Sequence, residues 1–193
     1  MPLNVMLWNV RSLNSPIKRT KCFEFLKRKN ISITVIQETH LKTSDIHRFQ
    51  SRCYKFHNVK ICFASIYCPN IPDPNFFNAT SATLLDMPEY LMVVGGDVNQ
   101  VCNITLDRSA NISSGLDAPS GINTFITELN IIDTFSRIDY IFVSPQLNQL
   151  TTSVDILPII ISDHAPVLYT VELTRNPAKR AHRWHFNTTL LQN

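Results

Sequence analysis

Glycine is scarce in this sequence, with only four copies in 193 residues. Turns that need a positive φ angle must therefore often be built from asparagine or aspartate, which tolerate this conformation better than other residues. The sequence also lacks any apolar run near the ~18 residues that span a bilayer, and its beginning has no basic segment leading into an apolar one. We therefore expect neither membrane insertion nor secretion.

Paired cysteine motifs are absent as well. The five cysteines are odd in number and show no CxxC or cysteine/histidine spacing of a metal site. We expect them to be reduced and mostly buried, which favours an intracellular compartment, either nuclear or cytoplasmic. They are Cys22, Cys53, Cys62, Cys68 and Cys102.

Positive charge is in only slight excess, with a net charge of +3 and an isoelectric point near 8.6. This excess permits a polyanionic partner without requiring one. Most of it lies in Pro16–Asn30 and Arg175–His185, which are typical both of nucleic-acid contacts and of ordinary solvated surfaces. With 44% hydrophobic residues, the composition predicts one globular domain over residues 1–174 and a polar, basic tail or linker over 175–193.

Short apolar runs alternate with amphipathic segments along the chain, which favours a layered α/β domain. The expected helices are 16–30, 72–87 and 119–130; in the first we expect Ile17, Phe23 and Leu26 to face inward, and in the second Leu85 among others. Ser15 and Pro16 fit the cap and first position of the first helix. The expected strands are 3–9, 31–38, 60–67, 90–96, 137–144 and 167–173.

Polar residues that could carry chemistry lie in or next to the predicted strands. Acids and amides gathered at one edge of a sheet would form an oxygen-rich site, which suits Mg²⁺, with Mn²⁺ as a substitute, better than zinc. A histidine beside an aspartate suits acid/base chemistry or the stabilisation of charge on a phosphate. The candidates are Asn9, Glu38, Tyr67, Asp97, Asn99, Asp139, Ser162, Asp163 and His164.

Each candidate also has an ordinary structural interpretation. Asp97 and Asn99 could form a turn in which their side chains cap the local backbone, and 162–166 could be a polar turn held by Ser162. Glu38 could begin a solvated helix, and Asn9 and Tyr67 could be satisfied residues at strand ends. Asp139 must be paired or exposed if its strand is internal.

Taken together and in this order, several motifs resemble the endonuclease/exonuclease/phosphatase superfamily, which contains DNase I and the apurinic/apyrimidinic endonucleases. They are most similar to the endonuclease domain of long-interspersed-element (non-LTR) retrotransposon polyproteins, and the C-terminal tail is similar to the linker that follows this domain. The resemblance spans nearly the whole chain. The motifs are WNVRSLNSPIKR, IQETHLK, ASIYCPN, GGDVNQ, SRIDYIFVSPQL and ISDHAPV.

The resemblance implies a four-layered α/β/β/α sandwich of the DNase I type, and the metal-dependent hydrolysis of phosphodiester bonds in DNA with no membrane or obligate protein partner. It also implies a role for each candidate. Glu38, Asn9 and Asp163 would hold or assist the metal, Asp97 would activate the attacking water, and Asn99 and Tyr67 would line the phosphate site. His164, oriented by Asp139, would stabilise the transition state, while Gly95 and Gly96 would form a tight strand exit before Asp97.

The sequence departs from the family pattern in three places. Arg11 stands where the repair enzymes of the family carry an acidic residue, which favours the retrotransposon branch. Between Glu38 and Tyr67 the family has additional strands for which this chain has no room, and after Phe135 it lacks an aromatic strand and a loop. We therefore expect truncated sheets.

These departures leave three functional hypotheses. The first is a metal-dependent endonuclease that nicks DNA. The second is a catalytically impaired remnant that at most binds nucleic acid, and the third is a phosphatase of the same superfamily.

Overall fold

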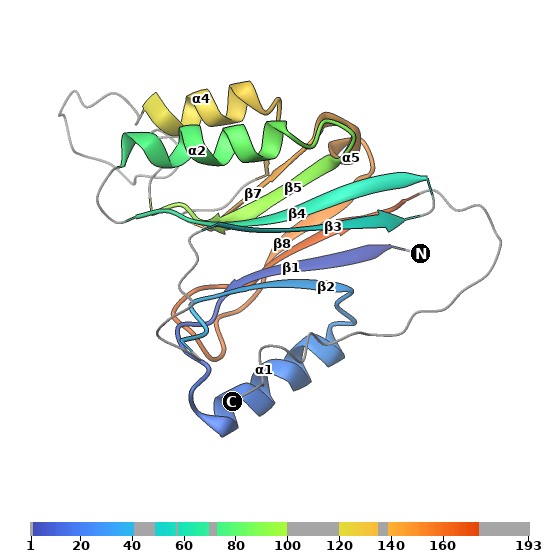
Figure 1. The fold of residues 1–193 in the computed structure, drawn as a ribbon. Helices are drawn as coiled ribbons and strands as arrows, with labels where there is room; N and C mark the ends of the chain where they lie inside the picture. Colours follow the sequence, from blue (N-terminus) through green and yellow to red (C-terminus); the bar gives the residue numbers. More distant parts are fainter. Residues whose placement is uncertain are drawn as a thin grey trace, which may run out of the picture.

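Two β-sheets packed face to face form the centre of the molecule in the computed structural model, which describes residues 2–40, 49–56, 58–69, 73–99, 120–134 and 139–173. Helices α2 and α4 cover the outer face of one sheet, and α1 lies on the outer face of the other (Figure 1). The chain thus forms four layers in the order α/β/β/α, which confirms the predicted fold class. The expected tail over 175–193 lies outside the described residues.

The first sheet has the strand order β2-β1-β9-β8. Strand β1 runs parallel to β2, whereas β9 is antiparallel to both β1 and β8. Because β1 and β2 are parallel, their C-terminal residues, Asn9 and Gln37, pair at the same edge of the sheet. The strands are β1 (Leu3–Asn9), β2 (Ile33–Gln37), β8 (Thr151–Ile156) and β9 (Val167–Val171).

The second sheet has the order β3-β4-β5-β7-β6, in which only the β4–β5 pair is parallel. The central strand β5 is buried along nearly its whole length, as expected for a continuous apolar run with neighbours on both sides. The strands are β3 (Phe49–Phe56), β4 (Val59–Tyr67), β5 (Leu91–Asp97), β6 (Ile132–Thr134) and β7 (Asp139–Val143).

Helix α1 has the start signals that its sequence predicted, whereas the short α5 was not predicted. Helix α1 (Pro16–Arg28) begins with Ser15 as N-cap, whose hydroxyl accepts from the Lys18 N–H, and with proline at its first position. Helix α2 (Pro74–Leu85) packs against α4 (Ser120–Glu128) over the second sheet, and the short α5 (Pro145–Asn148) follows β7. None of the described helices combines the length and the apolar character needed to cross a bilayer.

Three apolar clusters stabilise these layers. One lies between the two sheets, one lies between the second sheet and the helices α2 and α4, and one lies between the first sheet and α1. Trp8 is fully buried in the cluster beneath α1, and its ring contacts that of Phe25. Three of the four described cysteines, Cys22, Cys62 and Cys68, are buried, as predicted, whereas Cys53 is exposed.

Several predictions about the elements were wrong. The interval between Glu38 and Tyr67 does have room for another strand, because β3 forms an antiparallel hairpin with β4 there; β6 and β8 were also missed. Ile17 is 70% exposed and Leu85 is 53% exposed, because the buried stripe of α1 follows Cys22, Phe25 and Leu26, and that of α2 includes Phe77 and Leu84.

Gly95 and Gly96 do not form a turn. Strand β5 continues through both residues to Asp97, and neither has a positive φ angle. The reason for glycine is close packing: a Cβ on Gly96 would lie 1.6 Å from the carbonyl oxygen of Ile66 on β4.

Candidate active site

The predicted candidates are brought together where strands of both sheets end or begin. Tyr67, Asp97 and Asp139 stand on one rung of the second sheet, because Asp97 pairs with Tyr67 on β4 and with Asp139 on β7. Strands β4 and β5 end at this rung, and the antiparallel β7 begins there. The pair Asn9 and Gln37 at the end of the first sheet lies beside this rung, because the side chains of both residues are hydrogen-bonded to Asp97.

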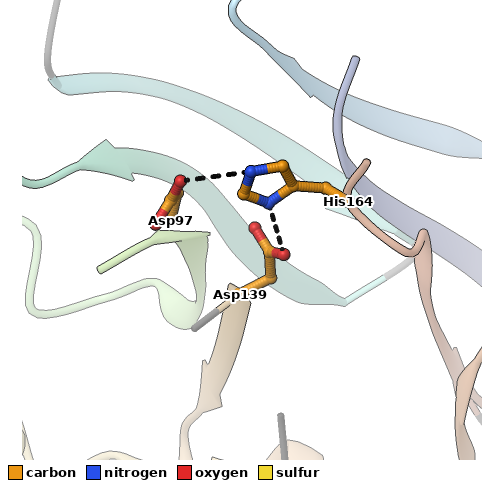
Figure 2. Close-up of side chains that lie close together, drawn as sticks. All are labelled: Asp97, Asp139 and His164. Atoms are coloured by element: carbon orange, nitrogen blue, oxygen red, sulfur yellow. Dashed lines mark hydrogen bonds and ion pairs between the residues drawn. The ribbon is translucent and has the colours of Figure 1, made fainter. Parts of the chain in front are cut away.

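His164 lies between two buried carboxylates (Figure 2). Its Nδ1 is 2.8 Å from Asp139 Oδ2, and its Nε2 is 3.9 Å from Asp97 Oδ2. The expectation that Asp139 must be paired is met by the histidine. The hydrogen bond through Nδ1 fixes the orientation of the ring and leaves Nε2 facing the carboxylate of Asp97, at the end of β5.

The Asn9 amide connects Glu38 to this group. Its Nδ2 donates to Glu38 Oε1 at 2.8 Å and to Asp97 Oδ2 at 3.3 Å, while its Oδ1 accepts from the Arg11 N–H at 3.1 Å. The hydrogen bond from Arg11 fixes which end of the amide faces the acids. Asn9 therefore orients two carboxylates with its N–H groups, and its oxygen faces the backbone.

Asn99 and Tyr67 complete one side of the site. The Asn99 N–H donates to Asp97 Oδ1 at 3.0 Å, which is the turn that the sequence allowed, and its side chain donates to the Cys68 carbonyl. Burial, together with a hydrogen bond to Glu38, raises the pKa of the Tyr67 hydroxyl. The two interpretations of the Asp97–Asn99 segment are thus compatible, because the turn itself points Asp97 into the site.

Asp163 lies apart from the predicted metal group. Its half-exposed carboxylate forms a salt bridge with Arg11, and its other described contact is with Ser162. Desolvation acts to raise the pKa of Asp163, but a hydrogen bond from its own backbone and the charge of Arg11 lower it overall. The guanidinium of Arg11 therefore already neutralises the acid that was predicted to assist the metal.

Burial dominates the electrostatics of the two inner acids. It raises the pKa of Asp97, against hydrogen bonds from Asn99 and Asn9, and it raises the pKa of Asp139, against the hydrogen bond from His164. Burial acts to lower the pKa of His164, but the hydrogen bond and charge of Asp139 and the charge of Asp97 raise it above its ordinary value. The site therefore favours the protonated imidazole more strongly than water does.

This shift predicts a pH dependence of stability. Because the folded-state pKa of His164 is raised, its contribution is fully present below the ordinary value of 6.5 and is lost as pH rises through the folded-state value. As the pH rises above about 6.5, the free energy of unfolding should fall more in the wild-type protein than in His164→Gln. Urea unfolding in metal-free buffer measures both, and equal slopes would contradict the shift.

Two further residues, Ser162 and Trp8, support His164. The Ser162 hydroxyl donates to the Asn9 carbonyl at 2.7 Å and accepts from the His164 N–H at 3.2 Å, so it joins the end of β1 to the histidine turn. The indole of Trp8 donates to the His164 carbonyl at 3.3 Å. Ser162 was a candidate from the sequence but had no assigned role other than holding a polar turn, whereas Trp8 was not a candidate and carried no signal beyond its apolar run.

Unusual backbone angles are concentrated at this edge of the molecule. Seven described non-glycine residues have positive φ, and none of the described glycines has. Asn30 and Asn130 follow helices, in the position where glycine is usual. The other five, in the loops after β1, β2 and β5, are Arg11, Ser12, Glu38, His40 and Asn99. The strain therefore lies next to the polar cluster, which is typical of functional sites.

Ser12 provides a test of this strain, because its φ of 80° suits glycine. We expect Ser12→Gly to raise the free energy of unfolding by about 0.5–1 kcal/mol, since the backbone hydrogen bond from Ser12 to the Glu38 carbonyl is kept. Among the hydrogen bonds of the described residues, the variant loses only an exposed one, from the Asn14 N–H to the serine hydroxyl. Urea denaturation gives the difference, and a destabilised variant would show that the hydroxyl outweighs the strain.

The sequence itself decides the family. Residues 6–164 match the Endonuclease/Exonuclease/phosphatase family, and this range contains every residue of the site described above. The chain belongs to that family.

Several solved structures of other proteins have a similar fold. The endonuclease domain of TRAS1, a telomere-specific non-LTR retrotransposon, has a TM-score of 0.65 at 13% identity, over 91% of this chain and 100% of that one. The 3'-5' exonuclease NExo from Neisseria meningitidis has a TM-score of 0.64 at 16% identity, over 89% of this chain and 100% of that one. A Neisseria structure of NExo as a 3' phosphatase bound to a product DNA hairpin has a TM-score of 0.60, also at 16% identity, with 89% and 100% covered.

Proposed function

We propose that this chain is a metal-dependent phosphodiester hydrolase that nicks DNA. The observation that carries the proposal is the buried Asp97–His164–Asp139 arrangement beside Glu38, in a member of the Endonuclease/Exonuclease/phosphatase family. A base and a cationic ring a few ångströms apart are what the attack of water on a phosphate needs.

The donor set fits a divalent metal ion such as Mg²⁺. Three carboxylates lie close together: the Asn9 amide joins Glu38 to Asp97, and His164 lies between Asp97 and Asp139. The buried Oδ1 of Asp139 has no hydrogen-bond partner among the described residues. A site with this negative excess would repel a phosphate unless a cation offset it. Oxygen ligands of this kind suit Mg²⁺.

Glu38 is the residue we assign to the metal. Ligand atoms of Asp97, Asp139 and His164 lie within 4.8 Å of one another, but an ion among them would compete with the Asp139–His164 hydrogen bond. The Glu38 side chain is 20% exposed, its Oε2 lies 3.7 Å from His40 Nε2, and the Tyr67 hydroxyl is hydrogen-bonded to the same carboxylate. When bound, the metal would neutralise charge on the phosphate, and Asn9 would hold the Glu38 carboxylate in place.

The remaining residues account for the chemical step. A water oxygen bonds to phosphorus while its proton moves to Asp97, whose raised pKa makes it a better base than an exposed aspartate. One P–O ester bond breaks, and the leaving oxygen takes a proton from solvent. Protonated His164 stabilises the charge on the phosphate oxygens, with Asp139 holding its ring. Asn99 and Tyr67 line the phosphate position.

Nicking of supercoiled plasmid tests the proposal directly. We expect relaxed circles to accumulate in Mg²⁺ or Mn²⁺ and not in the presence of a chelator, because relaxation requires a cut within the strand. A cooperatively folded protein that produces no relaxed circles in either metal would reject the endonuclease and favour the impaired remnant, which at most binds DNA.

A second candidate is the removal of a phosphate or nucleotide from a DNA 3' end. Two of the similar structures are named as a 3' phosphatase and a 3'-5' exonuclease, and the geometry around the phosphate does not depend on which alcohol leaves. A duplex carrying a labelled 3' phosphate distinguishes the activities. Faster release of phosphate than nicking, at equal concentrations of DNA, would favour this candidate.

The basic side of α1 is where we expect flanking DNA to bind. A groove of about 710 Å³ lies between α1 and the segment before His164, and more of its lining residues are basic than acidic. Positive charge on this flank complements the phosphate backbone. The lining residues are Lys21, Glu24, Phe25, Arg28, Lys29, Ile160 and Ile161.

Reversing two of these charges should weaken DNA binding and reduce its salt dependence. For Lys21→Glu combined with Arg28→Glu, we expect the slope of log affinity against log salt to become shallower by about 2, since each lost phosphate contact lowers it by about one. Fluorescence anisotropy with a labelled duplex in the absence of metal measures the slope. Lys55→Glu, on the exposed edge strand β3, is the control, and an equal effect there would argue against a specific surface.

A further inference from the structure

Gln37 is a buried polar residue that none of the roles above uses. It is the last residue of β2 and is only 5% exposed. Its side chain leaves the first sheet and reaches the second, where Nε2 donates to the Ile66 carbonyl at 2.6 Å and to Ser65 Oγ at 3.2 Å. Its Oε1 accepts from the Asp97 N–H at 3.0 Å. A single amide therefore uses its donors on β4 and its acceptor on β5.

The main chain of Gln37 is also held in place, by strand pairing and a backbone hydrogen bond. It pairs with Asn9 across the β1–β2 ladder, and its carbonyl accepts from the Val10 N–H at 3.1 Å. Glu38 follows directly, with a φ of 50°. Any shift of Gln37 would therefore move the ends of β1 and β2, which hold Asn9 and Glu38, relative to Asp97.

The second sheet is shaped to receive this side chain. A Cβ on Gly96 would lie 2.7 Å from Gln37 Nε2 as well as 1.6 Å from the Ile66 carbonyl oxygen. The residue that precedes Asp97 must therefore be glycine for the amide to reach β4. Away from this edge the space between the sheets is filled by apolar side chains, so the amide is a specific polar link and not part of a general polar layer.

We propose that Gln37 is a positioning residue that sets the distance between Glu38 and Asp97 across the two sheets. It does not touch the substrate or the reacting atoms. The inference rests on the proposed function, because it assigns Gln37 a part in the reaction of that site. One amide therefore fixes the distance between the metal-binding side of the site, at Glu38, and the proton-accepting side, at Asp97.

Gln37→Met is the variant that tests this role. Methionine has a similar length and fills the space, but it neither donates to Ile66 nor accepts from Asp97. We expect kcat for nicking to fall about 100-fold, because small displacements between reacting groups cost about this much. KM for DNA should stay unchanged, because Gln37 is buried away from any DNA surface.

Amide hydrogen exchange provides a readout that needs no activity. In the wild-type protein the Asp97 N–H is hydrogen-bonded to Gln37, so Gln37→Met should make this amide exchange about tenfold faster. Gln37→Glu is the conservative variant, since its carboxyl oxygen still accepts from Asp97. Protection of the Asp97 amide should be greater in Gln37→Glu than in Gln37→Met.

Ser144→Ala is the matched control. Ser144 is 7% exposed, and its hydroxyl accepts from the Met92 N–H at 2.7 Å, so it also fixes β5 by one side chain, but at the opposite end of the strand. We expect Ser144→Ala to speed exchange at Met92 and to leave kcat per folded molecule unchanged.

The outcomes separate this inference from the function on which it rests. If the wild-type protein fails to nick plasmid, the proposed function fails, and exchange at Asp97 still decides whether Gln37 holds that residue. Unchanged protection of the Asp97 amide in Gln37→Met would overturn the inference in either case. A kcat in Gln37→Met that matches Ser144→Ala would overturn it as well, since Gln37 would then act only on stability.

Discussion

Replacing Asp97 with asparagine is expected to lower the rate of plasmid nicking by about three orders of magnitude, the range typical for loss of a general base. Asparagine has nearly the same shape but cannot accept a proton from water. Its NH₂ group would also face the Asn9 amide and His164 Nε2, where the wild-type carboxylate accepts from one and lies 3.9 Å from the other. The substitution therefore removes the base and does not enlarge the site.

The same variant should not lose stability. Asp97 is 3% exposed and its pKa is raised by burial, which means that ionising this carboxyl in the folded protein is unfavourable. A neutral amide avoids that cost, which offsets the loss of the hydrogen bond from Asn9, so the free energy of unfolding of Asp97→Asn should stay close to that of the wild-type protein near neutral pH. Reduced nicking together with intact cooperative unfolding would assign the loss to chemistry.

Asp155→Asn is the matched control for this experiment. Asp155 lies on β8, is exposed, and bonds only to the Ser153 hydroxyl among its described hydrogen-bond partners. Its removal should leave nicking within about twofold of the wild-type rate, as for most surface substitutions. Full nicking activity in Asp97→Asn would show either that another group accepts the proton or that a contaminating nuclease supplies the activity.

The site could be predicted from the sequence because strands end where apolar runs meet polar residues. Strand β1 was predicted as 3–9 and is Leu3–Asn9, and the apolar run before Asp97 was predicted within one residue of its observed bounds. Once the strands are placed, parallel pairing brings their ends to one edge of each sheet. The proximity of Asn9, Glu38 and Asp97 follows from this pairing.

The missed strands lie where few side chains are buried, so their sequences have no recognisable pattern of apolar residues. Strands β3 and β8 are at the edges of their sheets, and the side chains described on them are mostly exposed or half-buried. Their residues therefore need not be apolar or alternate, and hydrophobic periodicity does not detect them. The exposure of Ile17 was missed for a different reason, since Ile17 lies off the buried stripe of α1, which contains Cys22, Phe25 and Leu26.

The contacts between the two sheets could not be predicted, because they depend on which residues face one another after folding. Gln37 reads as an ordinary polar residue at a strand end, and its role becomes visible only with Ile66 and Asp97 beside it. Arg11 and Asp163 are 152 residues apart in sequence, and their salt bridge changes the surroundings of an acid that the sequence alone places in the metal group.

Gly96→Ala is expected to be the most destabilising single substitution among those considered, with a loss of about 4 kcal/mol or more in the free energy of unfolding. The added Cβ would lie 1.6 Å from the Ile66 carbonyl oxygen, and backbone on a central strand cannot move aside as a side chain can. Since small domains have about 5–15 kcal/mol of stability in total, the variant should unfold at a much lower urea concentration or fail to fold.

Gly95→Ala is the control that separates this clash from the general effect of adding a methyl group to β5. A Cβ on Gly95 would meet the Leu7 side chain at 3.3 Å and the Tyr140 carbonyl oxygen at 3.4 Å, and the leucine can adjust. We expect a loss of about 1 kcal/mol, with nicking retained. Equal losses in the two variants would mean that β5 tolerates a side chain at Gly96 by moving away from β4. In that case Asp97 would move with the strand, and Gly96→Ala should then lose nicking even where it remains folded, whereas Gly95→Ala should not.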